Sequence, residues 1–150
     1  MTETKTANAV PPFVNKTMKA VLRSPLHGIV SKSILLISFT GRKSGKTHST
    51  PVSYTQDGNE VTIFTHATWW KNLGSKSMVT VRIRGRVYQG LAEPIVADKQ
   101  MIANKLAAHL RKVRSDAGFY EVTYDEQGNP RMDDVQKAVQ TVVMIRVRLY

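Results

Sequence analysis

The chain has 150 residues, with 22 Lys and Arg against 11 Asp and Glu, which gives a formal net charge of +11. Hydrophobic residues make up 41% of the sequence, enough to bury the core of one folded domain. There is no Cys, so disulfides, thiol nucleophiles and Cys-ligated metal sites are excluded, and we expect no metal centre. The positive charge predicts an anionic partner: nucleic acid, a membrane surface, or a small molecule with phosphate or carboxylate groups.

The N-terminal part of the chain predicts an arm followed by two short helices. Residues 1–12 are typical of a flexible arm, and residues 13–150 of a single domain. Phe13–Arg23 carries apolar residues on one side and cations on the other, so this helix either packs on the domain or lies on an anionic membrane. Pro25–Ser31 predicts the second helix. Without a signal peptide or a spanning segment, we expect a cytoplasmic protein or one at the inner face of the cell membrane.

From Ser33 onward the hydrophobic pattern changes to that of β-strands. Pro51 indicates a sheet edge or a bulge, and Asp57-Gly58 predicts a tight hairpin turn. Short strands joined by hairpins predict an α+β fold in which an antiparallel sheet closes into a small barrel with flanking helices. The predicted strands are Ile34–Thr40, Ser49–Thr55, Glu60–His66, Met78–Arg84, Val87–Ile95 and Val142–Tyr150. The predicted helical segments are Trp69–Leu73, Asp98–Val113 and Asp133–Gln140.

A cationic turn between the first two strands is the densest chemical signal. The segment 41–47 reads Gly-Arg-Lys-Ser-Gly-Lys-Thr and combines cations, hydroxyls and glycines. Glycines allow backbone N–H groups to face an anion, and Arg42 has the geometry for a bidentate phosphate contact. The spacing is one residue short of a nucleotide-binding P-loop and the segment does not open a long helix. The pattern fits an anion site and an exposed hairpin tip equally well.

Two other groups of residues favour ligand binding less strongly. The segment 65–73 ends a strand with hydroxyls, His66, an amide and two Trp, whose rings could wall a flat heterocycle or simply cover the core. Arg82 with Arg84, and Arg146 with Arg148, share strand faces, which is typical of a solvated sheet surface or of a basic stripe for nucleic acid. No hydrolytic motif is present, so an enzyme built on this chain would take its reactivity from a cofactor.

Several of these segments together resemble a known family. Residues 39–46, Phe-Thr-Gly-Arg-Lys-Ser-Gly-Lys, with residues 50–54, Asp57-Gly58 and residues 69–73, are similar to the deazaflavin (F420)-dependent nitroreductases, split β-barrel oxidoreductases of actinobacteria. The resemblance implies a split barrel like that of the FMN-binding pyridoxamine phosphate oxidases. It also implies coenzyme F420 as the cofactor, which is electrostatically matched to a chain of charge +11.

The resemblance also implies roles for individual residues. The phosphate and oligoglutamate tail of the cofactor would contact the cationic turn and the residue after it: Arg42, Lys43, Ser44, Gly45, Lys46 and His48. The deazaflavin ring would lie against Pro51 and Val52, with its edge at Thr65, His66 and Ala67. The groove would be flanked by Trp69, Trp70 and Asn72.

The region 114–130 departs from the family pattern, in which a Tyr-rich segment covers the substrate. Here Tyr120 and Tyr124 are the candidate catalytic residues, either as proton donors or as pocket walls. We expect hydride transfer to a quinone, a nitro compound or another unsaturated apolar acceptor, with menaquinone or a lipid as the membrane-dissolved examples. Split barrels often pair through their sheets, which favours a homodimer.

Two alternatives remain open at this level. A split barrel could bind FMN, haem or a fatty acid without redox turnover. A basic domain of this size could instead bind nucleic acid, although no aromatic residues interleave with the cations and no helix-turn-helix pattern is present, so we expect no nucleic-acid partner.

Overall fold

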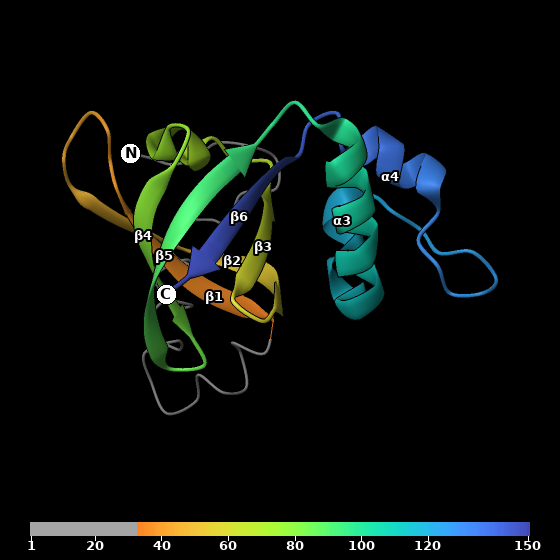
Figure 1. Ribbon diagram of the computed structural model, residues 1–150. Coiled ribbons are helices and arrows are strands. Elements are labelled where there is room, and N and C mark those ends of the chain that lie inside the picture. Colours follow the sequence, from red (N-terminus) through yellow and green to blue (C-terminus); the bar gives the residue numbers. More distant parts are fainter. Residues whose placement is uncertain (1–32) are drawn as a thin grey trace.

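The computed structural model describes residues 33–150; the predicted arm and the two helices before Ser33 lie outside the described residues. Six strands form the main body of this part of the chain, and Figure 1 shows them, labelled β1–β6, to the left of α3 and α4. Their bounds are β1 Ile34–Thr40, β2 Thr47–Asp57, β3 Glu60–Thr65, β4 Ser77–Ile83, β5 Arg86–Ile95 and β6 Val143–Leu149. The helical segments are η1 Trp69–Leu73, α3 Lys99–Lys112, η2 Arg114–Tyr120 and α4 Met132–Ala138, where η marks a 3-10 helix.

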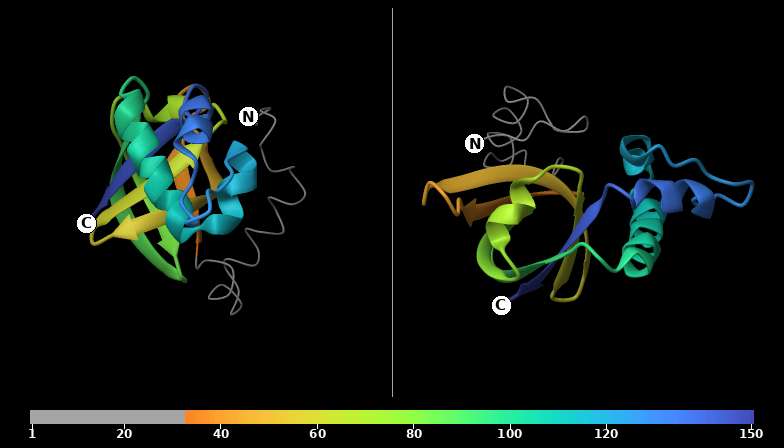
Figure 2. Two further views of the ribbon diagram at one scale, coloured as in Figure 1. Left: turned by 90° about the vertical axis from the view of Figure 1, so that its right-hand side faces the viewer. Right: turned by 90° about the horizontal axis from the view of Figure 1, so that it is seen from above.

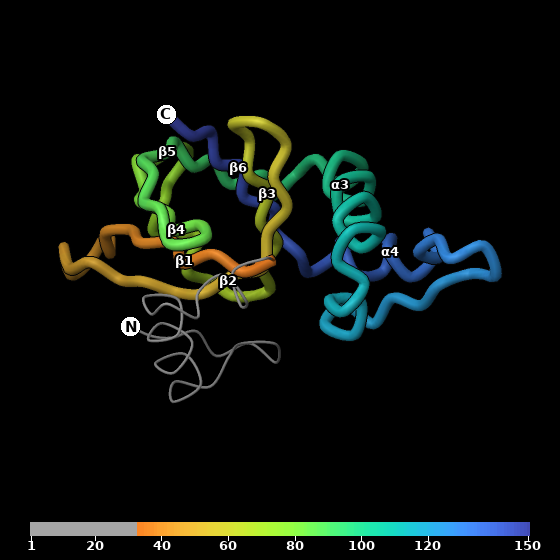
Figure 3. The backbone as a smooth tube through the Cα atoms, turned by 90° about the horizontal axis from the view of Figure 1, so that it is seen from below, coloured from red at the N-terminus to blue at the C-terminus, as the bar shows by residue number. Residues whose placement is uncertain are grey.

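The strands form a closed antiparallel barrel in the order β1-β2-β3-β6-β5-β4, with β1 also paired to β4. Figure 3 looks along this barrel and shows the strands arranged around it. The last strand of the chain, β6, lies between β3 and β5. Its residue Ile145 is opposite Ile63 of β3 on one side and opposite Pro94 of β5 on the other. Barrel closure therefore depends on the C-terminal segment. This six-stranded barrel with flanking helices confirms the predicted α+β split-barrel fold.

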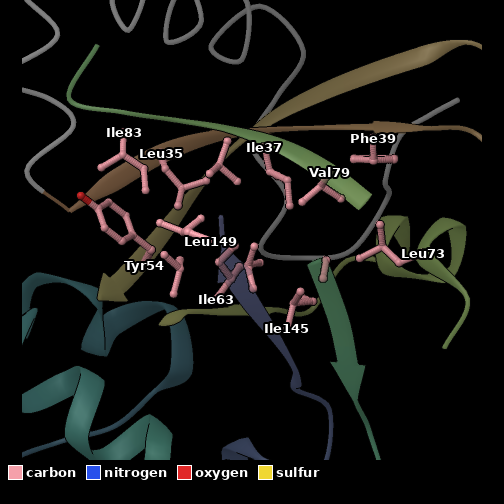
Figure 4. Packing of buried hydrophobic residues seen from close by; sticks show 14 of the residues in the cluster. Leu35, Ile37, Phe39, Tyr54, Ile63, Leu73, Val79, Ile83, Ile145 and Leu149 are labelled. Carbon is pink, nitrogen blue, oxygen red and sulfur yellow. The ribbon is translucent and has the colours of Figure 1, made fainter. Parts of the chain in front are cut away.

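The barrel interior is filled by alternate residues of every strand. On β1, Leu35, Ile37 and Phe39 point inward and are at most 6% exposed, because successive side chains of a strand lie on opposite faces. Figure 4 shows these residues meeting Ile63, Ile145 and others from across the barrel. The interior is thus a packed hydrophobic core, and ligands must bind on the outside or at the ends.

A second hydrophobic cluster joins the helices to one side of the barrel. Phe64 and Met144, which face outward from β3 and β6, pack with buried residues of α3, η2 and α4. The helices lie together on that side in both views of Figure 2. Asp98 caps α3, since its Oδ1 accepts a hydrogen bond from the Met101 N–H at 3.1 Å. No helix within residues 33–150 is both long and apolar enough to cross a membrane.

The element predictions are correct in kind, and they differ from the structure at several ends. The strand predicted over Ser49–Thr55 is longer, Thr47–Asp57, and pairs with β3 only from Tyr54 onward. Among the described strands, Pro51 therefore pairs with β1 alone. In the following hairpin Gly58 alone has a positive φ, 61°, whereas Asp57 ends β2. His66 and Arg84 lie just beyond β3 and β4 and do not belong to them.

The largest difference is in the segment after α3. The sequence predicted no helix between residues 113 and 133, but residues Arg114–Tyr120 form the 3-10 helix η2. The burial of Asp116 and Ala117 against α3 stabilises this turn, which is a tertiary effect that local sequence does not carry.

Candidate functional site

A groove of about 490 Å³ opens between the β1–β2 turn and η1, and we call it the η1 groove. The turn projects from the barrel on the side away from α3 and α4, as Figures 1 and 2 both show. Its charged lining residues are all cations. The groove is lined by Gly41, Arg42, Lys43, Ser44, His48, Thr68, Lys71 and Asn72.

Hydrogen bonds within the turn and from η1 fix its shape. The Gly41 N–H donates to the Lys46 carbonyl, and the Gly45 N–H donates to the Gly41 carbonyl, both at 2.8 Å. Gly45 has a φ of 71°, which a residue with a side chain rarely adopts. From the other wall, Asn72 Oδ1 accepts the Arg42 N–H at 3.1 Å, while Asn72 Nδ2 donates to the Trp69 carbonyl at 2.9 Å. Asn72 therefore couples η1 to the cationic turn.

The turn presents its positive charge through exposed side chains. We expected its backbone N–H groups to form an anion-binding nest, but those of residues 41, 42, 45 and 46 all donate to acceptors within the protein. Arg42 and Lys43 are exposed on one wall of the groove, and Lys71 on the other. Cations on both walls of a concave surface concentrate positive potential between them.

Of the two glycines in the turn, Gly41 is the one at which close packing leaves no room for a side chain. A Cβ at this position would lie 2.7 Å from His48 Nε2 and 2.8 Å from Ser44 Oγ, closer than real contacts allow. The His48 ring in turn lies 5.9 Å from the Phe39 ring, which stacks on Trp69 at 5.2 Å. The floor of the η1 groove is thereby continuous with the barrel core.

Trp69 has a mainly structural position. It is 6% exposed and belongs to the barrel core, so its ring is not available to a ligand in this arrangement. Trp70 is partly buried against the same core, and the Lys71 Nζ lies 5.9 Å from the centre of its ring. Of the two tryptophans expected to flank a cofactor, only Trp70 is partly accessible.

The residues predicted to contact a flat ring lie away from the cationic turn. Pro51 and Val52 occupy the part of β2 that pairs with β1 alone. Thr65 ends β3, and its Oγ1 accepts the Ala67 N–H at 3.0 Å, which shapes the bend that carries His66. None of these residues lines the η1 groove, and neither do Gly45 or the exposed Lys46.

His66 contacts one of the two predicted catalytic tyrosines. The rings of His66 and Tyr120 are 5.3 Å apart and tilted by 35°. Burial lowers the pKa of His66, an effect that the Glu121 carboxylate partly offsets. Burial, reinforced by the Asp116 charge, raises the pKa of Tyr120 well above its ordinary value. Near neutral pH this contact pairs a neutral imidazole with a protonated phenol.

Tyr124 has a different environment. Its hydroxyl donates to the Leu110 carbonyl at 2.7 Å, and its ring lies 3.9 Å from the guanidinium carbon of Arg114. This tyrosine therefore anchors the segment after η2 to α3. Only Tyr120 is placed beside another predicted site residue.

A buried polar junction, which the sequence did not reveal, joins β2 to the helices. Asp116 Oδ2 accepts a hydrogen bond from Ser53 Oγ and lies 2.8 Å from His109 Nε2. His109 is 1% exposed, and its Nδ1 is buried with no hydrogen-bond partner among residues 33–150. We call Ser53, His109 and Asp116 the β2–α3 junction. These residues are up to 63 positions apart, so only the fold brings them together.

Sequence reasoning also missed Thr68 and Lys71 as lining residues of the η1 groove. Both lie in the segment 65–73 that had been singled out for its Trp and hydroxyl residues. Their position in the sequence, between residues that were predicted to belong to the site, could have identified them. Within residues 33–150 no three His, Asp or Glu side chains gather as metal ligands.

The sequence matches a family model described as F420H2-dependent quinone reductase over residues 21–127. The chain belongs to this family. The F420H2-dependent quinone reductases are F420-dependent oxidoreductases, and the match confirms the resemblance drawn from the cationic turn. The family description names a quinone, which is one of the expected acceptor classes. No curated protein sequence matches the chain.

Similar solved structures have low sequence identity to this family member, and those with a TM-score of 0.52 share its fold. A domain-swapped dimer is 16% identical with a TM-score of 0.52, covering 91% of this chain and 97% of its own. A candidate 5-nitroimidazole antibiotic resistance protein of Bacteroides thetaiotaomicron is 12% identical with a TM-score of 0.52, covering 82% and 76%. An F420-H2 dependent reductase is 17% identical with a TM-score of 0.45, covering 76% and 94%.

Proposed function

We propose that this chain binds F420 with the anionic part of the cofactor in the η1 groove, and that it reduces a quinone. The observation that carries the proposal is the set of cations, Arg42, Lys43 and Lys71, that face one another across this groove. The family match supplies the redox class, and the groove supplies a location for the charged end of the cofactor.

The chemistry of the groove fits the phosphodiester and carboxylates of F420. Arg42 has the planar fork that binds phosphate bidentately, and Lys43 and Lys71 add point charges. The hydroxyl of Ser44, the ring of His48 and the amide of Asn72 add neutral hydrogen-bonding groups on the same lining. Within residues 33–150 no acidic residue lines the groove, so no described carboxylate there repels an anion.

The remaining predicted contacts extend the proposal towards the redox centre. Pro51, Val52, Thr65 and Ala67 would lie against the ring of the cofactor, which supplies a hydride when it is reduced. A quinone that accepts this hydride also takes up one proton to become the hydroquinone. The task of the protein is to align donor and acceptor and to exclude water.

We assign Tyr120 to the acceptor side of the site. Its raised pKa keeps the hydroxyl protonated, so it can donate a hydrogen bond to a quinone oxygen. His66 lies beside it and stays neutral at pH 7, because burial lowers its pKa. Neither group places a second negative charge near the developing hydroquinone.

Equilibrium titration of the purified full chain with F420, followed by fluorescence, tests the cofactor site. We expect the double variant Arg42→Gln, Lys43→Gln to weaken F420 binding by about tenfold or more, since two charge-assisted contacts are lost. The matched control Lys76→Gln, Lys105→Gln removes the same charge at exposed positions outside the groove and should leave affinity within about twofold.

Two outcomes would reject the proposal. Tighter binding of FMN than of F420 would show that FMN is the cofactor. Equal weakening of F420 binding in both double variants would show that F420 is held only by long-range attraction to a chain of charge +11. Oxidation of reduced F420 on addition of menaquinone, compared with a nitroimidazole and an enone at equal concentration, then tests the acceptor class.

We further propose a homodimer as the assembly, supported by the domain-swapped dimer among the similar folds. Sedimentation velocity of the full chain, of mass 16.8 kDa, separates monomer from dimer. Pelleting with and without phosphatidylglycerol vesicles tests the membrane association predicted from Phe13–Arg23, which lies outside the described residues.

A further inference from the structure

A second and larger groove of about 870 Å³ lies at the other end of β2, and we call it the α3 groove. The β2–β3 hairpin, the β4–β5 turn and the end of α3 with the start of η2 all contribute to it. Its lining shares no residue with the η1 groove. The lining consists of Ser33, Tyr54, Thr55, Gln56, Gly58, Ile83, Arg84, Arg86, Tyr88, Lys112, Val113, Arg114 and Ser115.

All charged lining residues of the α3 groove within residues 33–150 are cations, and they lie on separate elements. Arg84 follows β4 and Arg86 begins β5, whereas Lys112 ends α3 and Arg114 begins η2. No carboxylate from the described part of the chain lines the groove. Among residues 33–150 the ion pairs are His109–Asp116 and Arg146–Glu93, so none of these cations is neutralised by an acidic partner there. Such a lining favours an anion that bridges the walls.

Two of the cations are held in place before any ligand binds. Arg84 has a φ of 51°, a left-handed conformation that is costly for a residue other than Gly, Asn or Asp, and its side chain hydrogen-bonds the Tyr54 hydroxyl. Arg114 donates from Nη1 to the Gly128 carbonyl at 2.9 Å and packs on Tyr124. Fixed side chains lose little conformational entropy on binding.

We propose that the α3 groove binds a soluble small molecule that carries two or more phosphate groups, spaced to reach both cationic walls. The volume lies in the range typical of small-molecule sites, and residues of the β2–β3 hairpin, the ends of β4 and β5, and the α3–η2 segment line it. Tyr88, which is partly exposed, supplies ring surface for the carbon skeleton between the charges. The proposal concerns a site other than the cofactor groove and does not depend on F420.

An NMR titration of the full chain with inorganic triphosphate, at low ionic strength and without cofactor, tests the site. We expect saturable amide shifts at residues 84–86 and 112–115. The double variant Arg86→Gln, Lys112→Gln, which removes one exposed cation from each wall, should weaken this binding by about tenfold. The control Lys76→Gln, Lys105→Gln should change it by less than about twofold.

The variant Arg42→Gln, Lys43→Gln separates this proposal from the proposed function. It should abolish triphosphate shifts at residues 41–48 and leave those at the α3 groove unchanged. Shifts confined to residues 41–48 in the wild type, or equal weakening by both other double variants, would overturn the proposal. The proposal would also be overturned if the wild-type protein pelleted with phosphatidylglycerol vesicles and the Arg86→Gln, Lys112→Gln variant did not. That result would show that the groove binds a lipid surface.

Discussion

The η1 groove and the α3 groove lie at opposite ends of β2 and are positioned in different ways. The η1 groove is built within 32 residues of sequence, from Gly41 to Asn72, and its cationic turn is held by its own hydrogen bonds and by Asn72. The α3 groove needs residues from Ser33 to Ser115 and exists only where the helices pack on the barrel. A local site and a tertiary site should therefore respond differently to mutation.

The β2–α3 junction is the structural link that distinguishes them. Asp116 lies within η2, two residues after Arg114, and its carboxylate joins Ser53 of β2 to His109 of α3. The wall of the α3 groove that carries Lys112 and Arg114 depends on this link. The β1–β2 turn, which lines the η1 groove, projects from the barrel on the side away from α3 (Figure 1).

The largest effect is expected from Asp116→Ala. This change leaves the buried His109 and the Ser53 hydroxyl without their acceptor, which should lower the free energy of unfolding by about 2–4 kcal/mol in urea. Triphosphate shifts at residues 112–115 should weaken while F420 affinity stays within about twofold. Ser53→Ala, which removes one donor only, should cost about 1 kcal/mol. Equal loss of binding at both grooves would show that they are not structurally independent.

Gly41→Ala should affect the other groove. The new methyl group would overlap His48 Nε2 and Ser44 Oγ, so the turn must shift, at a cost of about 1–3 kcal/mol. We expect F420 affinity to fall by about tenfold, with triphosphate shifts at the α3 groove unchanged. Gly45→Asn is the control, because nothing lies within 4 Å of its Cβ position and Asn tolerates a positive φ. Equal losses from both variants would contradict the packing argument.

The two tyrosines provide a smaller test on the helical side. Tyr120→Phe keeps the ring beside His66 but removes the hydroxyl, and we expect quinone turnover to fall by about tenfold with unchanged F420 affinity. Tyr124→Phe loses the hydrogen bond to the Leu110 carbonyl, which should cost about 1 kcal/mol of stability without changing turnover. Steady-state kinetics and urea unfolding measure both. The opposite pattern would assign the catalytic role to Tyr124.

The smallest effect concerns pH and the segment between η2 and α4. Hydrogen bonds from the Thr123 hydroxyl and N–H to Asp134 Oδ2 lower the pKa of that carboxyl. A lowered folded-state pKa means that the stabilisation is present above the ordinary Asp value and is lost as pH falls through the folded-state pKa. Unfolding of Thr123→Val and wild type should therefore differ slightly at neutral pH and converge in acid. A constant difference across pH would exclude this carboxyl as the cause.

The sequence predicted the barrel because its signals are local. Alternation of apolar residues along β4 and β6 and the turn residues between strands are properties of a few neighbouring positions. The helix η2 was missed because its formation depends on the burial of Asp116 and Ala117 against α3. Strand β2 was predicted too short at its C-terminal end because polar residues such as Gln56 join the sheet through pairing with β3.

The sequence by itself determined the split-barrel class, the cationic turn and the family, because each depends on residue types within short segments of the chain. Only the tertiary structure decided which predicted residues are accessible and which are structural: it buries Trp69, ties Tyr124 to α3 and places Tyr120 beside His66. It also created the β2–α3 junction and the α3 groove. Both join residues far apart in the chain, and such proximity follows from strand pairing and helix packing, which no local pattern encodes.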